Sequence, residues 1–349
     1  MMPPLNLALV TGAAGFVGRR LCRDLNARGV RVRALDLAEV PGPWDEIHAH
    51  DLTRPLDLAP VLAEVDTVFH LAGLAHSSLI GSLAQAAYRE LNVEATRHLV
   101  AAATRCGVAR FLFLSSVKAL GEGDQGLLDD DSPPRPTSDY GRSKLEAEQI
   151  VLEAGRRTGM HVAVIRSALI YGAGVKGNLR EMVEAVTAGR FPPLAETGNR
   201  RSLIDVRDVT TALWLAATEP AANGRAYIVT DGQLYSTRRI LDAIRRGLNR
   251  SSPRLAVGPR LLRPLARLGD LLSRATRRAA PFNSDRHARL FGSAAYRGAA
   301  IARELGFQPR YVLEDVAGEM IAAAARESRA SIAGAASHEH TAAQHDETE

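Results

Sequence analysis

The stretch Leu9-Val10-Thr11-Gly12-Ala13-Ala14-Gly15-Phe16-Val17-Gly18 connects a short apolar run to a helical pattern near the start of the chain. Glycines at this spacing are typical of a strand that turns sharply into a helix and binds a dinucleotide. Gly12 allows the tight turn, Gly15 lets the backbone approach a pyrophosphate, and Gly18 lets the helix pack on the sheet. The stretch therefore predicts an α/β fold that binds a dinucleotide beside its first strand.

The residues that follow the loop indicate which dinucleotide binds. Phe16 and Val17 lie in the first helical turn, whose free N–H groups and dipole attract phosphate. Asp36 ends the second expected strand, where a carboxylate can accept hydrogen bonds from the adenine ribose. Such a carboxylate repels a 2′-phosphate, so we expect NAD rather than NADP. Asp51 and Leu52 follow the third strand, where they could hold the adenine.

The rest of the first 170 residues alternates short apolar runs with helical patterns. This alternation predicts a parallel sheet with crossover helices. The apolar runs show no clean polar alternation, as expected for strands that are covered on both faces. The expected strands are 5–10, 30–35, 67–71, 111–114 and 161–165, and the expected helices are 16–28, 82–105 and 140–157.

The pattern changes beyond Tyr171. Helices are expected at 178–188 and 209–217, strands at 202–206 and 226–230, a helical, arginine-rich stretch at 237–296, and a small cap with a helix at 300–325. The tail from Ser328 is small, polar and charged, which predicts disorder. We expect a dinucleotide-binding domain of residues 1–171 and 203–232, a smaller, mostly helical substrate domain of residues 172–202 and 233–327, and a disordered tail of residues 328–349.

The composition is that of an ordinary globular enzyme, since 46% of the 349 residues are hydrophobic and 24% are charged. No run approaches 18 consecutive apolar residues, so we expect no transmembrane segment. The first apolar run is short and leads into the glycine loop, unlike a secretory signal. Two cysteines are too few for a disulfide framework or a zinc site, and both lie in helical patterns, as expected of buried small hydrophobes. We expect a cytoplasmic enzyme.

The net charge of +5 rests on arginine, because all of the 44 basic residues except Lys118, Lys144 and Lys176 are arginines. We interpret this as a general preference for arginine and expect no nucleic-acid partner. The stretch 245–297 holds 13 arginines against two acids. Three interpretations of it remain open: a solvated face of the substrate domain, an electropositive approach for a nucleotide diphosphate, or peripheral membrane contact through 260–278, where leucines and arginines form an amphipathic pattern.

A second motif, Ser138-Asp139-Tyr140-Gly141-Arg142-Ser143-Lys144, follows a proline-rich segment. Ser138 is an expected helix N-cap, which places Tyr140 and Lys144 four residues apart on one helical face. A phenol ionises near pH 10, too high for a base at neutral pH, and a nearby ammonium should lower that pKa. The pair therefore predicts a tyrosine that exchanges a proton with the substrate.

Two serines end the expected strand 111–114. The carboxyl ends of parallel strands are where such sheets bind ligands. Alone, Ser115 or Ser116 is more simply a strand-end cap. Together with Tyr140 and Lys144, Ser116 is expected to hold the substrate oxygen.

These motifs, in this order, resemble those of extended short-chain dehydrogenase/reductases, specifically the nucleotide-sugar epimerase/dehydratase group. The resemblance runs from about Leu7 to Asp315. It includes 70–73 (His-Leu-Ala-Gly), 91–96 (Leu-Asn-Val-Glu-Ala-Thr), 166–172 and 201–206 (Arg-Ser-Leu-Ile-Asp-Val). It implies a Rossmann-type, doubly wound parallel sheet with a smaller helical domain, NAD as cofactor, a UDP-sugar as substrate, and a homodimer through helices near 86–105 and 140–157.

The resemblance also implies a role for each matching residue. Ser116 would hydrogen-bond the C4 oxygen of the sugar, Tyr140 would exchange its proton, and Lys144 would hold the nicotinamide ribose. The other implied cofactor positions are Leu71, Ala72, Gly73 and Ser115, with Asn92 as a support from its helix. The implied substrate ligands are Asn178 and Leu179 for the sugar nucleotide and Arg201 for the diphosphate, which a forked guanidinium suits.

The stretch Ser116-Val117-Lys118 departs from the resemblance. Sugar dehydratases of this group carry Thr-Asp-Glu there, so elimination of water has no evident acid and base in this chain. The epimerases usually carry a small hydroxyl residue where this chain has Lys118. Its ammonium could contact a substrate phosphate or carboxylate, or could face solvent. With 174–178 and 199–202, the stretch resembles a bacterial branch of 4-epimerases and 4-ketoreductases for surface-polysaccharide sugars.

The sequence leads to one hypothesis and three alternatives. We expect an NAD-dependent UDP-sugar 4-epimerase, which oxidises C4 of the sugar, turns the 4-keto sugar in the pocket and reduces it from the other face. The first alternative is an NAD(P)H-dependent reductase of a UDP-4-keto sugar, which would use the same residues. The others are a dehydrogenase for a sterol or other non-nucleotide alcohol, and a dinucleotide-binding sensor without turnover.

Overall fold

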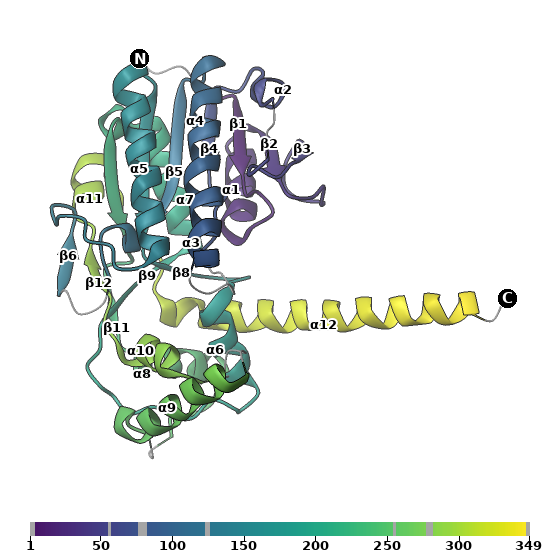
Figure 1. Cartoon of the computed structure of the whole chain (residues 1–349), viewed down its shortest axis with the longest axis vertical. Coiled ribbons are helices and arrows are strands. Elements are labelled where there is room, and N and C mark those ends of the chain that lie inside the picture. Colours follow the sequence, from purple (N-terminus) through teal and green to yellow (C-terminus); the bar gives the residue numbers. More distant parts are fainter. Residues whose placement is uncertain are drawn as a thin grey trace. The chain divides into compact units, whose positions relative to one another are not determined.

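A seven-stranded parallel sheet in the order β10-β7-β5-β4-β1-β2-β3 forms the centre of the first half of the chain (Figure 1). It is seen in a computed structural model that describes residues 4–54, 57–75, 82–122, 126–253, 256–276 and 282–346. The strands are β1 (Leu7–Thr11), β2 (Arg31–Asp36), β3 (Glu46–Ala49), β4 (Thr67–His70), β5 (Arg110–Ser116), β7 (His161–Ser167) and β10 (Arg225–Val229). The expected doubly wound parallel sheet is confirmed.

The strand order reverses at β1. From β1 the chain builds outward to β2 and β3 on one side, and to β4, β5, β7 and β10 on the other. In open parallel sheets, ligands bind at the carboxyl ends of the strands beside such a reversal. The glycine loop follows β1. The His-Leu-Ala-Gly stretch begins at the last residue of β4 and continues past it. Both segments therefore lie at the carboxyl ends of the two central strands, beside the reversal.

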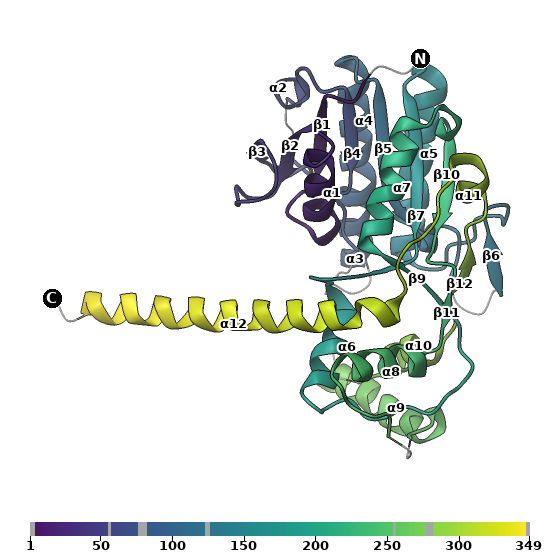
Figure 2. The ribbon, with the colours of Figure 1, turned by 180° about the vertical axis from the view of Figure 1, so that it is seen from behind.

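Helices cover both faces of the sheet, as the strand sequences predicted. On one face lie α4 (Ala95–Arg105) and α5 (Asp139–Thr158) (Figure 1), and on the other lie α1 (Phe16–Asn26) and α7 (Val206–Thr218) (Figure 2). Alternate residues of each strand point to opposite faces. Leu9 and Phe113 pack with α4 and α5, whereas Val10 and Leu112 pack with α1 and α7.

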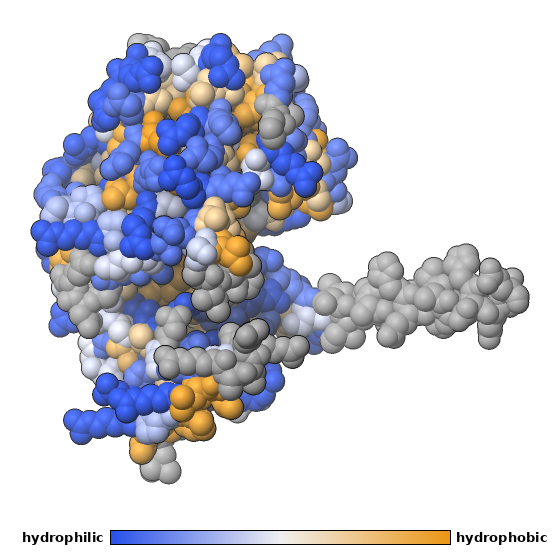
Figure 3. All heavy atoms as spheres, viewed as in Figure 1, coloured by the Kyte–Doolittle hydropathy of each residue, from blue (hydrophilic) through white to orange (hydrophobic). Residues whose placement is uncertain are grey.

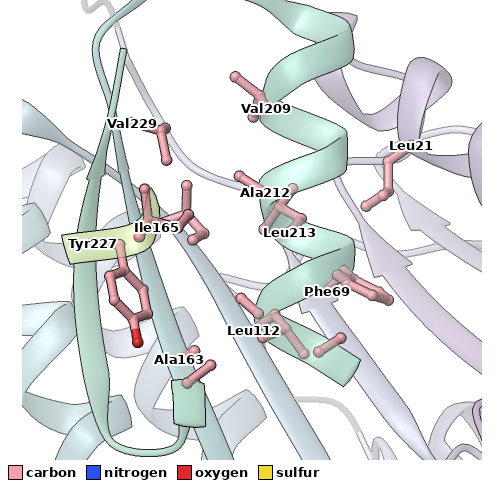
Figure 4. Packing of buried hydrophobic residues seen from close by; sticks show 14 of the residues in the cluster. Leu21, Phe69, Leu112, Ala163, Ile165, Val209, Ala212, Leu213, Tyr227 and Val229 are labelled. Carbon is pink, nitrogen blue, oxygen red and sulfur yellow. The ribbon is translucent and has the colours of Figure 1, made fainter. Parts of the chain in front are cut away.

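The core beneath α7 joins distant parts of the chain. Figure 4 shows Val209 and Leu213 of α7 above Ile165 of β7, Leu112 of β5 and Phe69 of β4. Each of these side chains is fully buried, so none of the strands has an open face there. Burial of apolar area on both faces fixes the strand ends that carry the site.

Shorter elements complete this half of the chain. They are α2 (Ala59–Leu62), α3 (Ser82–Tyr88), the π-helix η1 (Arg89–Glu94), the 3-10 turns η2 (Val117–Ala119) and η3 (Pro220–Ala222), and α11 (Ala300–Leu305). Two small sheets have the strand orders β11-β9-β8, with β11 (Leu234–Tyr235), β9 (Arg201–Asp205) and β8 (Leu169–Tyr171), and β12-β6, with β12 (Ala295–Arg297) and β6 (Leu127–Asp129).

The chain divides into two compact units. The first comprises the chain up to Ile170, Gly198–Tyr235 and Phe291–Tyr311, and the second comprises Tyr171–Thr197, Ser236–Leu290 and the chain from Val312. The second unit is helical, with α6 (Gly177–Thr187), α8 (Thr237–Gly247), α9 (Pro259–Thr276), α10 (Ser284–Phe291) and α12 (Leu313–Asp346).

Three expectations about the second half are corrected. Residues 198–202 and 291–311 belong to the first unit, because β12 pairs in parallel with β6 and α11 packs on β10. Helix α12 continues to Asp346 where disorder was expected from Ser328, because that segment is rich in alanine and lacks proline; residues 347–349 lie outside the described residues. Cys22 is buried as expected, but Cys106 caps the exposed end of α4.

Candidate active site

The glycine loop between β1 and α1 leaves no room for side chains. Gly12 has a φ of +66°, and a Cβ there would lie 2.8 Å from the backbone nitrogen of Ala72. A Cβ at Gly18 would lie 2.2 Å from the carbonyl oxygen of Gly12. The first turn of α1 starts at Phe16 without a side-chain cap. The loop is therefore a backbone cradle, and the N–H groups in the first turn of α1 suit a pyrophosphate.

Asp36 connects the end of β2 to the glycine loop through a hydrogen bond. One oxygen of its carboxylate accepts a hydrogen bond from the Ala14 nitrogen at 2.8 Å, and the other accepts one from Leu37 at 2.8 Å. Asp51 lies in the loop after β3, where its carboxylate accepts hydrogen bonds from the backbone and side chain of Thr53, which lower its pKa. The adjacent Leu52 is buried. No sequence pattern predicted the contact between Asp36 and the loop.

A buried histidine ties the glycine loop to the end of β4. Burial holds the pKa of His70 at about 3, so its ring is neutral. Thr96 donates to the carbonyl of Asn92 at 2.7 Å, so it must accept from Nε2 of His70 at 2.9 Å. The other ring nitrogen then accepts from Thr11 at 2.7 Å, and the oxygen of Thr11 accepts from the Ala72 nitrogen at 3.2 Å. This chain of hydrogen bonds orders the segment Leu71–Gly73.

Asn92 lies in the π-helix η1, where the expected single helix 82–105 is interrupted. Its side chain accepts from the Leu74 nitrogen at 2.7 Å and donates to the Leu74 carbonyl and to Ser143 of α5. A Cβ at Gly73 would lie 3.0 Å from the Asn92 amide oxygen and 3.7 Å from Nζ of Lys144. Asn92 thus joins the end of β4 to α5. Helical interruptions of this kind often occur at functional sites.

Ser116 and Tyr140 meet at the carboxyl end of β5. Ser138 caps α5 as expected, accepting a hydrogen bond from the Gly141 nitrogen at 3.0 Å, and this sets Tyr140 in the first turn. Burial raises the pKa of Tyr140 to about 12, and a hydrogen bond with Ser116 opposes that rise. Charges at Tyr88 and Glu122 raise the pKa further.

Lys144 lies buried against the end of β5. Nζ of Lys144 donates to the carbonyl of Leu114 at 2.8 Å and lies 4.1 Å from the ring centroid of Phe113. Burial lowers the pKa of Lys144 to about 7, although the carboxylate of Glu148 opposes this. The ammonium therefore contacts the strand end, and burial is the main cause of the raised pKa of the nearby Tyr140 phenol.

Beneath Lys144 lies a buried ion pair. Glu148 accepts hydrogen bonds from Arg166 at 2.7 and 3.1 Å and from the hydroxyl of Ser115 at 2.5 Å. Ser115 is thus held against α5 by this carboxylate. Glu148 follows Lys144 by four residues on the same helix, so spacing alone could have identified it.

Lys118 lies beside Tyr140. Its side chain is 49% exposed, with Nζ 5.9 Å from the ring centroid of Tyr140 and 3.6 Å from the carboxylate of Glu122. Glu122 also accepts a hydrogen bond from the hydroxyl of Ser138. The sequence did not indicate Glu122, because it lies in an irregular segment with no helical or strand periodicity.

The remaining predicted substrate residues lie on separate elements. Arg201 starts β9 in the first unit, where burial lowers its pKa and Tyr296 opposes the change. Asn178 and Leu179 lie in the first turn of α6 in the second unit; Asn178 is exposed and Leu179 is buried in the core of that unit.

Comparison with known proteins identifies the family. A family model described as the NAD dependent epimerase/dehydratase family matches residues 8–230. The chain belongs to this family. The match covers the glycine loop, the Ser116–Tyr140–Lys144 set and every strand of the main sheet, so the enzyme is a NAD-dependent member of the epimerase/dehydratase class.

Relatives of this family member have differing substrates. A UDP-glucose 4-epimerase of Vibrio cholerae is 29% identical over 71% of this chain and 78% of its own length. A 3-beta-hydroxysteroid dehydrogenase of Mycolicibacterium neoaurum is 31% identical over 74% of each chain. The solved structure of MoeE5 in complex with UDP-glucuronic acid and NAD has a TM-score of 0.73 at 26% identity, over 92% of this chain and 99% of that chain.

The residues of this epimerase/dehydratase fit NAD. The cradle after β1 would be blocked by a Cβ at Gly12 or Gly18, and the start of α1 has no side-chain cap. Asp36 presents its carboxylate at the end of β2, next to the loop. Gly73, Asn92 and the ammonium of Lys144 lie together at the end of β4. In the described part of the chain, no cluster of His, Cys, Asp and Glu is arranged to hold a metal ion.

Proposed function

We propose that this enzyme is an NAD-dependent UDP-sugar 4-epimerase of bacterial surface-polysaccharide sugar metabolism. The observation that carries the proposal is the hydrogen bond between Ser116 and Tyr140 at the end of β5, with Lys144 buried on the same face of α5. The likeness to the Vibrio cholerae UDP-glucose 4-epimerase and to MoeE5 with UDP-glucuronic acid and NAD supports a UDP-sugar substrate.

In this proposal Ser116 binds the C4 oxygen of the sugar and Tyr140 exchanges the proton of that oxygen. Bound NAD, held by the glycine loop and Lys144, would supply a hydride acceptor for C4 and then a hydride donor for the opposite face of the ring. Tyr140 accepts the hydroxyl proton as C4 is oxidised and gives it back as the 4-keto sugar is reduced. Proton and hydride thus both return to the substrate, and the reaction has no net redox change.

The protonation state of Tyr140 favours one half of this cycle. With a pKa of about 12, the phenol of the ligand-free protein carries its proton at neutral pH and is ready to act as an acid. Acting as a base requires a lower pKa, which positive charge near the ring provides. Lys118 carries a positive charge 5.9 Å from the ring centroid, and its ion pair with Glu122 offsets part of that charge.

Arg201, Asn178 and Leu179 are the proposed ligands of the sugar nucleotide. Arg201 suits the diphosphate because its guanidinium can bind two oxygens at once. Asn178 and Leu179, at the start of α6, match positions that contact the sugar nucleotide in the resembling proteins. The exposed ammonium of Lys118 would contact an anionic or polar substituent of the sugar.

A second candidate is a net oxidoreductase on the same scaffold, such as an NAD(P)H-dependent reductase of a UDP-4-keto sugar. The similarity to a 3-beta-hydroxysteroid dehydrogenase favours it, because that relative is named for oxidation of a hydroxyl carbon. The same Ser116, Tyr140 and Lys144 would serve, and the substrate would have no need to turn. Net oxidation of NADH or NADPH distinguishes this candidate from the epimerase.

The test follows both the sugar and the nicotinamide absorbance. The purified enzyme is incubated with UDP-glucose, UDP-galactose and their N-acetyl forms, and also with a UDP-4-keto sugar and NADH or NADPH. We expect interconversion of a 4-epimer pair without a net change in absorbance. Stoichiometric loss of NADH or NADPH only with the keto sugar would assign the reductase instead.

The variant Tyr140→Phe tests the role of the phenol. Because it keeps the ring and removes the proton donor, we expect turnover to fall by about 10²-fold or more. The control is Tyr88→Phe, whose ring centroid lies 5.8 Å from that of Tyr140, and we expect it to keep most of the activity. Full turnover by Tyr140→Phe would overturn the mechanism.

A further inference from the structure

Helix α9 packs on its own unit through one narrow face. Ala266 and Gly269 on that face are buried, and Leu262 is half-buried. A Cβ at Gly269 would lie 1.8 Å from the carbonyl oxygen of Phe282, so the helix lies close against that segment. This contact leaves the other faces of α9 to the solvent.

A row of leucines occupies the next face of α9. Leu261, Leu265, Leu268, Leu271 and Leu272 are each exposed by 51% to 71%. Four of them follow one another by four, three and four residues, which places them on one side of a helix. Single exposed apolar side chains are common on soluble proteins, but a contiguous apolar face usually marks an interaction site. The five adjacent exposed leucines therefore indicate a binding partner.

Arginines occupy a third face of the same helix. Arg260, Arg263 and Arg267 are exposed, and the only acid within α9, Asp270, accepts hydrogen bonds from Ser284. In Figure 3, hydrophobic and strongly hydrophilic side chains lie next to each other at the lower end of the view, where α9 runs in Figure 1. The exposed surface of α9 is therefore apolar on one side and cationic on the other.

The leucine row and the neighbouring arginines together indicate which kind of partner binds α9. A second copy of the chain would bring its own arginines against these arginines, and like charges oppose such pairing. The stretch 245–297, which contains α9, holds 13 arginines and two acids, so this segment is itself strongly cationic. An anionic lipid surface provides both an apolar layer and phosphate groups of the complementary charge.

We propose that α9 binds the surface of an anionic lipid bilayer, with its leucine row in the boundary between headgroups and acyl chains and its arginines at the phosphate groups. The helix lies in the plane of the surface. In the described part of the chain, no helix is long and apolar enough to cross a membrane. The contact is thus peripheral and reversible, and it places the enzyme at the membrane without anchoring it.

The test is sedimentation of the full chain with vesicles. Vesicles of phosphatidylcholine alone are compared with vesicles that contain about 30% phosphatidylglycerol, at low and at high salt. We expect binding to the anionic vesicles that weakens as salt screens the arginines. Leu265→Ser/Leu268→Ser should lower the partition coefficient at least about tenfold, because two leucine side chains leave the apolar layer. Arg263→Gln/Arg267→Gln should weaken binding and reduce its salt dependence.

Two controls keep the result interpretable. Leu127→Ser removes an exposed leucine from β6 of the other unit and should leave vesicle binding unchanged. Molar mass and turnover on soluble substrate, measured without vesicles, should be the same for wild type and leucine variants. The proposal is overturned if the wild type does not bind anionic vesicles or binds neutral vesicles equally well. It is also overturned if the wild type does not bind vesicles and the Leu265→Ser/Leu268→Ser substitutions only abolish its self-association.

Discussion

Lys144 is a buried cation whose closest described contacts are a carbonyl, an aromatic ring and, four residues further along α5, the carboxylate of Glu148. Arg166 already neutralises that carboxylate through bidentate hydrogen bonds at 2.7 and 3.1 Å. The ammonium therefore receives only part of the compensation that a buried charge requires, and its pKa falls to about 7. The position suits the function of the lysine more than the stability of the fold.

The loss of folding stability caused by burying the Lys144 ammonium can be measured as a function of pH. The pKa of Lys144 is about 7 in the folded protein and near 10.5 when unfolded. Between these two pH values the Lys144 amine is protonated in the unfolded chain and neutral in the folded protein. The loss of stability is therefore complete below about pH 7 and disappears above about pH 10.5. Lys144→Met should raise Tm by several degrees at pH 7, as expected for about 1–3 kcal/mol in a chain of this length. The gain should shrink towards pH 10.

Thermal unfolding of Lys144→Met at pH 7 and about pH 9.5, followed by circular dichroism, gives the measurement. The matched control is Lys176→Met, which replaces an exposed lysine before α6 and should leave Tm unchanged at both values. A Lys144→Met protein that is less stable than wild type at pH 7 would contradict the argument.

At the scale of the elements, the packing of α1 on the glycine loop depends on Gly18. Gly18 lies where a Cβ would be 2.2 Å from the carbonyl oxygen of Gly12 and 2.7 Å from the backbone of Ala13. Gly18→Ala should therefore push α1 away from the loop, cost more than about 2 kcal/mol of stability and weaken NAD binding at least about tenfold. Calorimetric titration with NAD and thermal unfolding measure the two effects.

A second helical glycine provides the control. A Cβ at Gly318 of α12 would meet no atom within 4 Å, so Gly318→Ala should stabilise that helix by about 0.5–1 kcal/mol and leave NAD binding unchanged. Unaltered NAD affinity in Gly18→Ala would show that the close packing of α1 on the loop is not required for the cofactor.

Local patterns were enough to predict the elements that carry the site. The glycine loop, the cap at Ser138 and the Tyr140–Lys144 spacing are signals within a few residues, and the structure has a turn, a cap and a helix at those positions. What sequence reasoning missed depends on distant contacts. Glu122 reaches Lys118 from an irregular segment, and the pairing of β12 with β6 joins strands more than 160 residues apart.

At the scale of the whole molecule, the resemblance predicts a homodimer. The helices expected at its interface, α4 and α5, pack side by side on one face of the sheet. We expect a mass of twice 37.5 kDa in solution, measured by light scattering. Ala101→Glu, on the exposed side of α4, should give monomers because the carboxylate would be buried without a partner. Ala221→Glu, an exposed alanine in η3, should remain dimeric. A monomeric wild type at all concentrations would contradict this prediction.

The scarcity of lysine has a consequence for laboratory handling of the protein. The chain offers three lysine amines, of which Lys144 is buried and Lys118 and Lys176 are exposed. Amine-reactive dyes, crosslinkers and sensor surfaces will therefore attach mainly at Lys118, Lys176 or the chain start. Since Lys118 lies beside Tyr140, an immobilised or labelled sample would have part of its population obstructed next to Tyr140. Attachment through the exposed thiol of Cys106 avoids that position.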